Sequence, residues 1–469
     1  MLPHVAALSD STYRPVWLDS EGRPETLAPL EGDARCQLLI VGGGFTGLWA
    51  ALQVKEQQPD LDVVLVEQTF IGDGASGRNG GFLNTSLTHG ETNGDYHFPG
   101  EAEHLEELGL QNMKAFIETL ERYNIDAEYE HVGHTAVATN EAMALKLRSQ
   151  FEAGKAAGRD VVWFDGDDMR RQVNSPTYKA GLWHRDGQDG VVNPGKLCWG
   201  LKKTILSLGV RIFENTPVLD VAPDGDGMLT TCASANIRSD KILMATNAFR
   251  GLLPQIRRQV IPVWDYQIAT EPLTPEQLDS INWGKNRHAL SNEAYMFHYY
   301  RMTKDNRITW GGGGAVCYYY GSRTDQGVAD DRGRFERLSK EFFETFPQLQ
   351  GVRFSHRWSG IIASSTRFCM VPGVAFDGRV SWAVGYTGLG VGATRFGARI
   401  GLELLGYQPS DILDMLFVKR RAMNWAPEPL RWIGVTLTRH ALAKADANGG
   451  KRGLWLKLLD YFHLTGFAC

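Results

Sequence analysis

The stretch LLIVGGGFTGLWAAL, at residues 38–52, restricts the possible folds of this 469-residue chain more than any other. An apolar run at 37–41 ends in glycines, helix-forming residues follow at 45–57, and a second apolar run, DVVLVE, occupies 62–67. Strand, glycine turn, helix and strand together make a βαβ unit. Both runs are apolar without alternation, which is typical of parallel strands with both faces buried. The sequence therefore predicts an α/β fold with a Rossmann-like domain.

The glycines of this turn fit a dinucleotide-binding motif. Gly42, Gly44 and Gly47 occupy the three glycine positions of G-x-G-x-x-G, where they allow a tight turn, close approach of a pyrophosphate, and close packing of helix on strand. Glu67 ends the second apolar run, about 20 residues further on, where a carboxylate accepts both ribose hydroxyls. A carboxylate there repels a 2′-phosphate, so the motif indicates FAD or NAD and not NADP.

A second glycine cluster, GASGRNGG at 74–81, follows the ribose-binding strand closely. An NAD enzyme has no need of it, but a flavin enzyme has to bring its backbone close to a flat and rigid ring system, and glycines permit that approach. Closely spaced N–H groups can also face the polar edge of the ring. The cluster favours FAD over NAD, and the alternative is an ordinary surface loop.

Composition and charge narrow the class of protein. A formal net charge of −5 with 22% charged residues is ordinary for a globular protein and gives no sign of a nucleic-acid partner. No apolar run approaches the roughly 18 residues that span a bilayer, and the start MLPHVAALSDS lacks the features of a signal peptide, so we expect a cytoplasmic protein without an integral membrane span. The six cysteines include no C-x-x-C pair, so we expect no metal site.

The rest of the chain predicts further helices and a second strand-to-helix passage. Amphipathic helices are predicted at 101–123, 193–209 and 334–346. Asn193 is placed to cap the second of them. The passage at 380–405 repeats the first unit with a strand-like run, a glycine-rich loop at 385–392 and a helix. A chain of this length exceeds the roughly 250–300 residues of a single core, which indicates two domains.

Five motifs carry a resemblance to a known family: PLEGDARCQLLIVGGGFTGL, IGDGASGRNGG, YYRMTKDNRITWGGG, RWSGIIASS and VGYTGLGV, in this order. Over most of its length the chain resembles the D-amino-acid oxidase superfamily of FAD-dependent oxidoreductases, which includes glycine oxidase and sarcosine oxidase, and by motif it is most similar to the gamma-glutamylputrescine oxidase branch. The resemblance implies a discontinuous FAD-binding domain and an α+β substrate domain with a mixed or antiparallel sheet. The expected parts are the FAD-binding domain (30–100, 185–255 and 355–410), the substrate-binding domain (101–184 and 256–354) and a C-terminal helical extension (411–469).

The resemblance also implies which residues meet the cofactor. The second glycine cluster would lie along the flavin, Val218 would meet the adenine, and Ala245 would begin a segment that returns the chain to FAD. The loop at 385–391 opens a helix, whose positive end suits the negative charge of a reduced flavin. The expected FAD-binding residues are Gly42, Gly44, Phe45, Thr46, Gly47, Glu67, Gln68, Gly74, Ala75, Ser76, Arg78, Asn79, Gly80, Gly81, Val218, Ala245, Gly385, Gly388, Leu389, Gly390 and Val391.

In this family a neutral amine transfers a hydride from its α-carbon to flavin N5, and the imine is hydrolysed without an obligatory side-chain base. Relatives often have Gly-His-Gly in the loop where this chain has Leu389, and glycine oxidase has an arginine for the α-carboxylate where this chain has Ile362. The missing guanidinium argues for an amine, or for a substrate whose acid group is far from the reacting carbon, with Arg301 or Arg367 as alternative clamps. The candidate pocket residues are Tyr300, Arg301, Trp358 and Leu389.

The resemblance implies an oxidase that uses O2 and releases H2O2. Its FAD is expected to be non-covalent, because Ser359, Gly360 and Ile361 stand where sarcosine oxidases have a cysteine. Three alternatives stay open: an amino-acid or N-substituted glycine dehydrogenase that passes electrons to a quinone or carrier, a flavin-binding subunit without turnover, and an NAD(P)H-dependent monooxygenase. We expect the amphipathic end from Gly453 to pack on the rest of the chain; docking on a membrane, a groove or a second subunit is the alternative.

Overall fold

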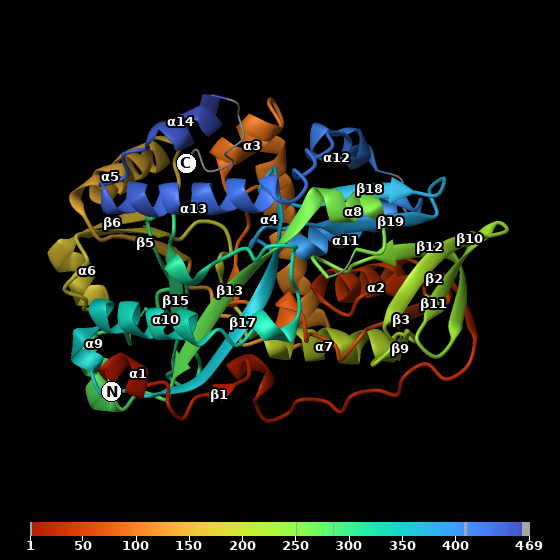
Figure 1. Cartoon of the computed structure of the whole chain (residues 1–469), viewed down its shortest axis with the longest axis horizontal. Helices are drawn as coiled ribbons and strands as arrows, with labels where there is room; N and C mark the ends of the chain where they lie inside the picture. The colour runs from red at the N-terminus through yellow and green to blue at the C-terminus, as the bar shows by residue number, and fades with distance from the viewer. Residues whose placement is uncertain (1, 250, 285, 408–409, 462–469) are drawn as a thin grey trace.

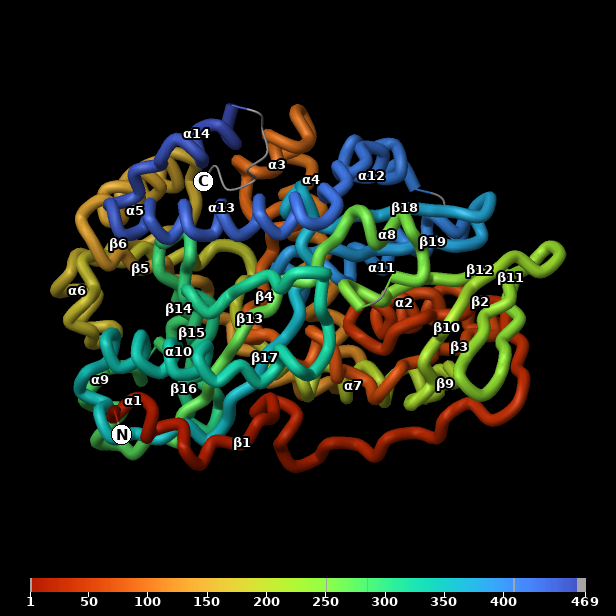
Figure 2. The backbone as a smooth tube through the Cα atoms, in the orientation of Figure 1, coloured from red at the N-terminus to blue at the C-terminus, as the bar shows by residue number. Residues whose placement is uncertain are grey.

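The computed structural model describes residues 2–249, 251–284, 286–407 and 410–461. Two large sheets lie side by side, one built around the glycine motifs on the right of Figure 1 and one on the left. The N-terminal segment starts beside the left sheet and runs along the lower edge of the molecule to the right one, as the red trace in Figure 2 shows. The expected C-terminal extension reaches residue 469, and its last part, 462–469, lies outside the described residues.

The eight-stranded sheet contains the predicted βαβ unit. Its strands are β2 (Ala34–Val41), β3 (Val63–Val66), β9 (Arg211–Phe213), β10 (Val218–Asp224), β11 (Gly227–Cys232), β12 (Asn236–Met244), β18 (Val371–Ala375) and β19 (Val380–Val384). The strands β9, β3, β2, β12 and β19 are parallel to their neighbours in this order. All residues of β3 are buried, as both faces of an inner parallel strand should be. The predicted α/β fold is confirmed.

Hydrophobic clusters lie on both faces of this sheet. On one face, Leu38 and Ile40 pack with Leu48 and Trp49 of α2 (Phe45–Gln57) in one hydrophobic cluster. The alternate residues of β2 belong to another cluster on the opposite face, because successive side chains of a strand point to opposite sides. The predicted bounds of α2 agree with the structure.

The other helices include those that the sequence predicts. In α7 (Pro194–Ser207) the Asn193 side chain accepts the N–H of Lys196 at 3.2 Å, so the predicted cap is formed. The remaining helices are α1 (Pro3–Ala6), α3 (Glu91–His97), α4 (Ala102–Arg122), α5 (Glu141–Ala156), α6 (Gly166–Gln172), α7 (Pro194–Ser207), α8 (Pro254–Gln259), α9 (Pro275–Ile281), α10 (Arg332–Thr345), α11 (Ala393–Leu404), α12 (Leu416–Lys419), α13 (Leu430–Ala447) and α14 (Leu454–Tyr461). Among the residues that the structure describes, no helix combines the length and the hydropathy that a membrane span needs.

The nine-stranded sheet is mixed and forms the other half of the molecule. In spatial order its strands are β1 (Thr12–Tyr13), β17 (Phe354–Ser365), β13 (Val260–Thr270), β16 (Ile308–Gly312), β15 (His298–Met302), β14 (Leu290–Asn292), β5 (His134–Ala138), β7 (Ala180–His184) and β6 (Val161–Asp165). The long strands β13 and β17 are antiparallel. A short ribbon of β4 (Phe82–Leu83) and β8 (Gly190–Val191) lies apart from both sheets.

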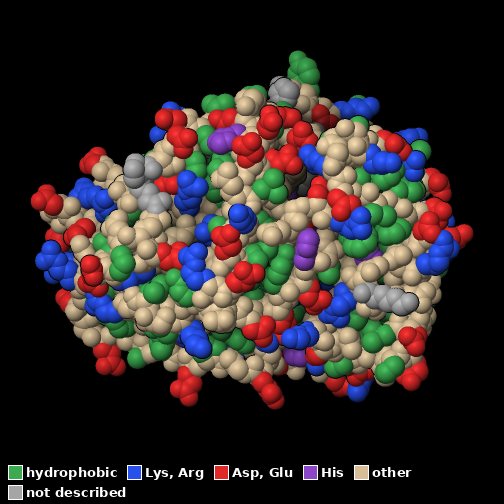
Figure 3. All heavy atoms as spheres, turned by 180° about the vertical axis from the view of Figure 1, so that it is seen from behind, with side chains coloured by type: hydrophobic (Ala, Val, Ile, Leu, Met, Phe, Trp, Pro, Cys, Tyr) green, Lys and Arg blue, Asp and Glu red, His purple; other side chains and the backbone are tan. Residues whose placement is uncertain are grey.

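The inner side of the C-terminal segment packs on the chain. Leu442, Ala445 and Leu456 form a cluster with Tyr295 and Met296, which agrees with the expectation that the segment from Gly453 packs on the chain, as far as α14 reaches. The outer side keeps apolar side chains exposed, including Leu437, Leu454 and Leu458. On the face seen from behind in Figure 3, basic and acidic side chains are interspersed.

Candidate functional site

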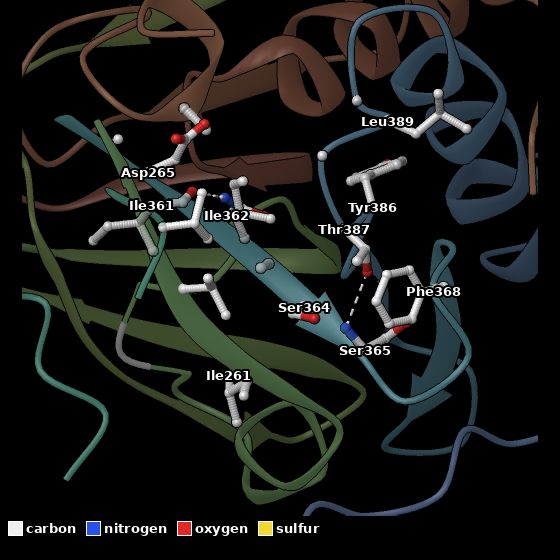
Figure 4. A pocket seen from close by; sticks show the side chains of 18 of the residues that line it. Ile261, Asp265, Ile361, Ile362, Ser364, Ser365, Phe368, Tyr386, Thr387 and Leu389 are labelled. Atoms are coloured by element: carbon white, nitrogen blue, oxygen red, sulfur yellow. Dashed lines mark hydrogen bonds between the residues drawn. The ribbon is translucent and has the colours of Figure 1, made fainter. Parts of the chain in front are cut away.

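A cavity of ≈ 1950 Å³ is lined by residues of both sheets. Its lining includes Val41 and Val66, at the carboxyl ends of β2 and β3, and ligands of open parallel sheets bind at such ends. The volume exceeds the roughly 300–1,000 Å³ that is usual for pockets of a single small ligand. The cavity therefore has room for a dinucleotide and for a second small molecule. Figure 4 shows part of its wall, with Asp265 on one side and Leu389 on the other.

The first glycine motif lies at the N-terminus of α2, against the cavity. Gly42 has a φ of +112°, and a Cβ there would lie 2.6 Å from the carbonyl oxygen of Ala245, so this tight turn requires glycine. A Cβ on Gly44 would lie 2.9 Å from Oγ of Ser76, and one on Gly47 would collide with the carbonyl oxygen of Gly42. Apart from the N–H of Phe45, which donates to Oγ of Ser76, the N–H groups of the first helical turn can face an anion.

Glu67 follows β3 and lines the cavity. One carboxylate oxygen accepts the N–H of Gly43 at 2.7 Å, and the other accepts the N–H of Thr69 at 3.1 Å. Because a carboxylate has about four acceptor positions, capacity remains for the hydroxyls of a ribose. Burial raises the pKa of Glu67 above its ordinary value, and the N–H donors of Gly43 and Thr69 act against that shift.

The second glycine cluster forms an internally bonded loop. Oγ of Ser76 accepts the N–H of Phe45 at 2.8 Å, which links the loop to the first turn of α2. The Asn79 amide donates to two carbonyl oxygens of the same loop at 2.8 and 3.1 Å. A Cβ on Gly80 would lie 2.7 Å from the ring of Tyr299. This backbone can therefore lie close to a flat ligand on one side while it packs on an aromatic ring on the other.

The third glycine loop joins β19 to α11. The hydroxyls of Thr46 and Tyr386 are 2.9 Å apart, so a hydrogen bond holds this loop against the first turn of α2. The N–H of Leu389 donates to the carbonyl oxygen of Tyr386 at 3.0 Å. Leu389, Gly388 and Gly390 line the cavity.

One cavity gathers most of the expected FAD-binding residues. Those that line it are Gly42, Gly44, Phe45, Thr46, Glu67, Gln68, Gly74, Ala75, Ser76, Arg78, Asn79, Gly80, Val218, Ala245, Gly388, Leu389, Gly390 and Val391. Gly47, Gly81 and Gly385 lie outside this lining, where a Cβ on each would crowd a neighbouring atom. The polar side-chain atoms of the lining that are buried without a partner in the described part of the chain include Oγ1 of Thr246 and Oε1 of Gln267. The glycine turn at 42–47 suits a pyrophosphate, and the Glu67 carboxylate suits a ribose. With the unpartnered polar atoms of the lining, these features fit FAD.

Three predicted pocket residues do not line the cavity, contrary to expectation. Tyr300 is 1% exposed and lies on the face of β15 opposite to Tyr299, because neighbouring residues of a strand alternate; its hydroxyl is 2.7 Å from that of Tyr178. Arg301 donates to the carbonyl oxygens of Gly80 and Val192 at 2.9 and 2.6 Å.

Trp358 is fully buried, and its Nε1 donates to the carbonyl oxygen of Arg78 at 2.8 Å. Arg301 and Trp358 therefore hold the second glycine cluster from behind. Of the predicted pocket residues, Leu389 is the one in the lining.

Sequence reasoning missed two groups of the cavity wall. Asp265 and Tyr299 line the cavity and are hydrogen-bonded to each other. The segment VIPVWDYQIAT contained a signal, because an Asp inside an apolar strand is almost never fully buried unless it is paired with another group.

The C-terminal extension also contributes to the wall, although its sequence gave no sign of this. Nε1 of Trp425 donates to the carbonyl oxygen of Ser364 at 3.1 Å, and the carboxylate of Asp446 accepts the N–H groups of Tyr295 and Met296 at 2.8 and 2.9 Å. The lining residues of this segment include Met423, Trp425, Leu430, Arg431, Val435, Arg439, Leu442, Asp446 and Trp455. The extension closes the cavity on the side of the larger sheet.

Comparison with known proteins agrees with this site. Residues 37–404 match the DAO family model, described as FAD dependent oxidoreductase. The chain is 30% identical over 376 residues to gamma-glutamylputrescine oxidoreductase of Escherichia coli, covering 79% of this chain and 83% of that relative. It is 28% identical over 404 residues to the probable oxidoreductase OrdL of Haemophilus influenzae, covering 84% and 88% of the two chains.

The fold is similar to that of glycine oxidase from Geobacillus kaustophilus, with a TM-score of 0.65 and 18% identity over 81% of this chain and 96% of that one. The family model covers the glycine motifs, Glu67 and the loop around Leu389. The chain belongs to the DAO family of FAD-dependent oxidoreductases.

Proposed function

We propose that this enzyme oxidises the C–N bond of a primary or secondary amine to an imine, which water hydrolyses, with O2 as the electron acceptor and H2O2 as the second product. The observation that supports the proposal is that the arginines near the cavity donate hydrogen bonds to other groups of the protein. A simple α-amino acid needs a bidentate guanidinium for its carboxylate. The two arginines that the sequence offered for that role have their donors engaged elsewhere.

Arg367 is 3% exposed and donates to the carbonyl oxygens of Met370, Arg420 and Phe417. Arg301 is equally buried and bonds carbonyl oxygens behind the second glycine cluster. The position that would hold a clamp after Gly360 belongs to Ile362, which lines the cavity with an apolar side chain.

The cavity-lining arginines of the extension are engaged in part. Arg431 donates to Oγ of Ser322 at 3.0 Å, and Arg439 donates to the carbonyl oxygen of Gly314 at 2.7 Å, while its Nε has no partner in the described part of the chain. Together with the apolar Ile362, these contacts favour a substrate whose acid group is far from the reacting carbon. This is compatible with the relative named gamma-glutamylputrescine oxidoreductase, and we extend that substrate class, an amine with a distant acid group, to this chain.

The chain's own residues bind and orient the reactants. The first turn of α2 would hold the pyrophosphate, Glu67 the ribose, and the segment Arg78–Gly80 with the loop around Leu389 the flavin. FAD bound there would supply the two-electron chemistry, as the acceptor for a hydride from the α-carbon of the amine and the donor of two electrons to O2. The protein supplies no acid or base in this scheme; the apolar side chains of Val263 and Ile362 exclude water beside the amine.

The experiment is anaerobic mixing of the purified flavoprotein with amines. Polyamine derivatives, N-alkyl glycines, aminophosphonates and D-amino acids are added in turn, and the visible flavin absorbance is followed. An amine oxidoreductase loses that absorbance with at least one amine, and readmitted O2 restores it with formation of H2O2. Restoration by a quinone but not by O2 would replace the oxidase with a dehydrogenase. A flavin that no compound reduces would contradict the proposal.

A further inference from the structure

A buried carboxylate lies on a part of the cavity wall that the FAD-binding residues do not form. Asp265 is 6% exposed and faces the cavity together with Val263 and Gln267, because alternate residues of β13 share a face. In β17, Ile361 and Ile362 pair with the two residues that precede Asp265. Figure 4 shows the carboxylate beside these two isoleucines. A charged group is thus set in an apolar wall.

The partners of this carboxylate are hydrogen-bond donors. The hydroxyl of Tyr299 donates to one oxygen at 2.5 Å, and the N–H of Tyr266 donates to the other at 2.8 Å. A further donor is the backbone N–H of Gly312. Donors favour the ionised form, although burial has the larger effect and raises the pKa of Asp265 to about 6. At neutral pH Asp265 is therefore ionised, and the burial of its negative charge is energetically unfavourable.

Among the described residues, no Lys or Arg side chain offsets the unfavourable free energy of this buried charge. Within the described ranges of the chain, no Lys or Arg forms an ion pair with Asp265, and its electrostatic interaction with His298 is the smallest of the effects on it. A buried charge without a counter-ion is unfavourable unless a ligand supplies one. The open side of Asp265 is the cavity.

Three other carboxylates of the lining are paired with a cation, bonded to backbone N–H groups or partly exposed to water. Glu293 pairs with Lys146 at 2.9 Å. Asp446 accepts two backbone N–H groups. Asp189 remains partly exposed and accepts the N–H and hydroxyl of Thr85. Asp265 is the carboxylate most removed from water in this lining.

We propose that Asp265 binds the substrate in its ammonium form, that the substrate is an alkylammonium compound whose chain lies along Val263 and Ile362, and that the bound ammonium releases one proton to solvent water before the neutral amine transfers its hydride. The proposal rests on the proposed function, because amine oxidation is what brings a cation to this wall. Tyr299 is a positioning residue, since its hydroxyl holds the carboxylate while its ring packs on Gly80. Gly80 lines the same cavity, so the bound amine lies next to the segment expected along the flavin.

The test measures binding of n-butylammonium chloride and of 1-butanol, two probes of similar size that differ in charge, to the FAD-loaded enzyme under anaerobic conditions near pH 8. Dissociation constants come from the perturbation of the flavin spectrum or, if the amine reduces the flavin, from the concentration dependence of the reduction rate. We expect the ammonium ion to bind at least tenfold more tightly than the alcohol. In Asp265→Asn that preference should fall to less than threefold, with the affinity for 1-butanol changed less than twofold.

Two further variants sharpen the test. Asp189→Asn removes the rival carboxylate of the lining and should leave the cation preference intact. Asp377→Asn removes an exposed charge, 97% exposed in its side chain, and controls for net charge. If Asp265→Asn does not fold, the comparison of the two dissociation constants in the native enzyme still tests whether this wall binds a cation.

Equal affinities for the two probes in the native enzyme, or a cation preference that survives in Asp265→Asn and disappears in Asp189→Asn, would overturn the role of Asp265. Either result leaves the proposed function standing if an amine still reduces the flavin. A yellow enzyme that no amine reduces contradicts the proposed function itself, and with it the role of Asp265.

Discussion

The hydroxyl of Tyr299 donates a hydrogen bond of 2.5 Å to the carboxylate of Asp265, which joins β15 to β13 at the cavity wall. Burial raises the pKa of Asp265 to about 6, and this bond counteracts part of the rise. The pair therefore sets the pH range over which the wall is negatively charged. Tyr299 itself stays neutral, because burial raises its pKa well above the ordinary value.

A first prediction concerns the pH dependence of amine binding. In the native enzyme the affinity for n-butylammonium should fall as the pH decreases through about 6, because Asp265 becomes protonated and loses its charge. Tyr299→Phe removes a donor that favours the ionised form, so the midpoint of this fall should move to higher pH. Dissociation constants measured between pH 5 and 8.5 check this. An unchanged midpoint in Tyr299→Phe would show that the hydroxyl does not control the carboxylate.

A second prediction concerns stability. The folded-state pKa of Asp265, about 6, is above its ordinary value of 3.8, so the stabilising effect of this raised pKa is complete below pH 3.8 and is lost as the pH rises through 6. At pH 8 the buried anion then costs at most about 3 kcal/mol. Asp265→Asn should raise the melting temperature of the ligand-free holoenzyme by a few degrees at pH 8.

This stabilisation should shrink by half or more at pH 5, where the native carboxyl is largely protonated in the fold. Differential scanning calorimetry at both pH values checks it, with Asp377→Asn as the control that changes neither value. A lower melting temperature of Asp265→Asn at pH 8 would mean that the carboxylate stabilises the fold and is not held for a ligand.

A third prediction concerns the cofactor. Glu67→Gln keeps the size of the side chain and removes the charge that the ribose hydroxyls would meet. A hydrogen bond to a charged group contributes about 1.5–3 kcal/mol, so the dissociation constant for FAD should rise by about 10- to 100-fold. Titration of the apoprotein, followed by quenching of flavin fluorescence, measures it.

The matched control is Asp62→Asn, in the residue that precedes β3 at its other end, where the carboxylate pairs with Arg211 at 2.9 Å on the surface. That variant should bind FAD as the native chain does. If both variants bind FAD equally well, the carboxylate at the end of β3 does not hold the ribose.

A fourth prediction separates Arg301 from a substrate clamp. Arg301→Met leaves the carbonyl oxygens of Gly80 and Val192 without their donor, and each unsatisfied buried acceptor costs about 1–3 kcal/mol. The melting temperature should fall and FAD should dissociate more readily. The ratio of the KM values for an N-alkyl glycine and for the corresponding alkylamine should stay within twofold of the native ratio. A selective rise of KM for the carboxylate-bearing compound would restore Arg301 as a clamp.

The sequence predicted the FAD-binding half of the molecule well, because local geometry decides it. Gly42 and Gly47 each stand where a Cβ would meet backbone, and such steric requirements appear directly in a glycine pattern. Glu67 could be placed because the length of a βαβ unit fixes where its second strand ends. The strand, loop and helix around Leu389 could be read from the same kind of pattern.

The substrate side could not be predicted in the same way. Tyr299 and Tyr300 are adjacent residues of the same type. The register of β15 against β16 decides which of the two side chains reaches the cavity. Arg301 and Trp358 were expected in the pocket, but carbonyl oxygens of a distant loop take their donors. Asp446 reaches the cavity only because α13 folds back across the chain. Such contacts between distant segments leave no short-range signal.

The most direct test of the central claim, that a flavin in this cavity oxidises an amine held at Asp265, is anaerobic stopped-flow mixing of native enzyme and Asp265→Asn with an amine that reduces the native flavin. The account predicts loss of visible flavin absorbance in both, with a dissociation constant for the amine at least about threefold higher in the variant. A native flavin that stays oxidised with every amine, or equal dissociation constants in the two proteins, would contradict it.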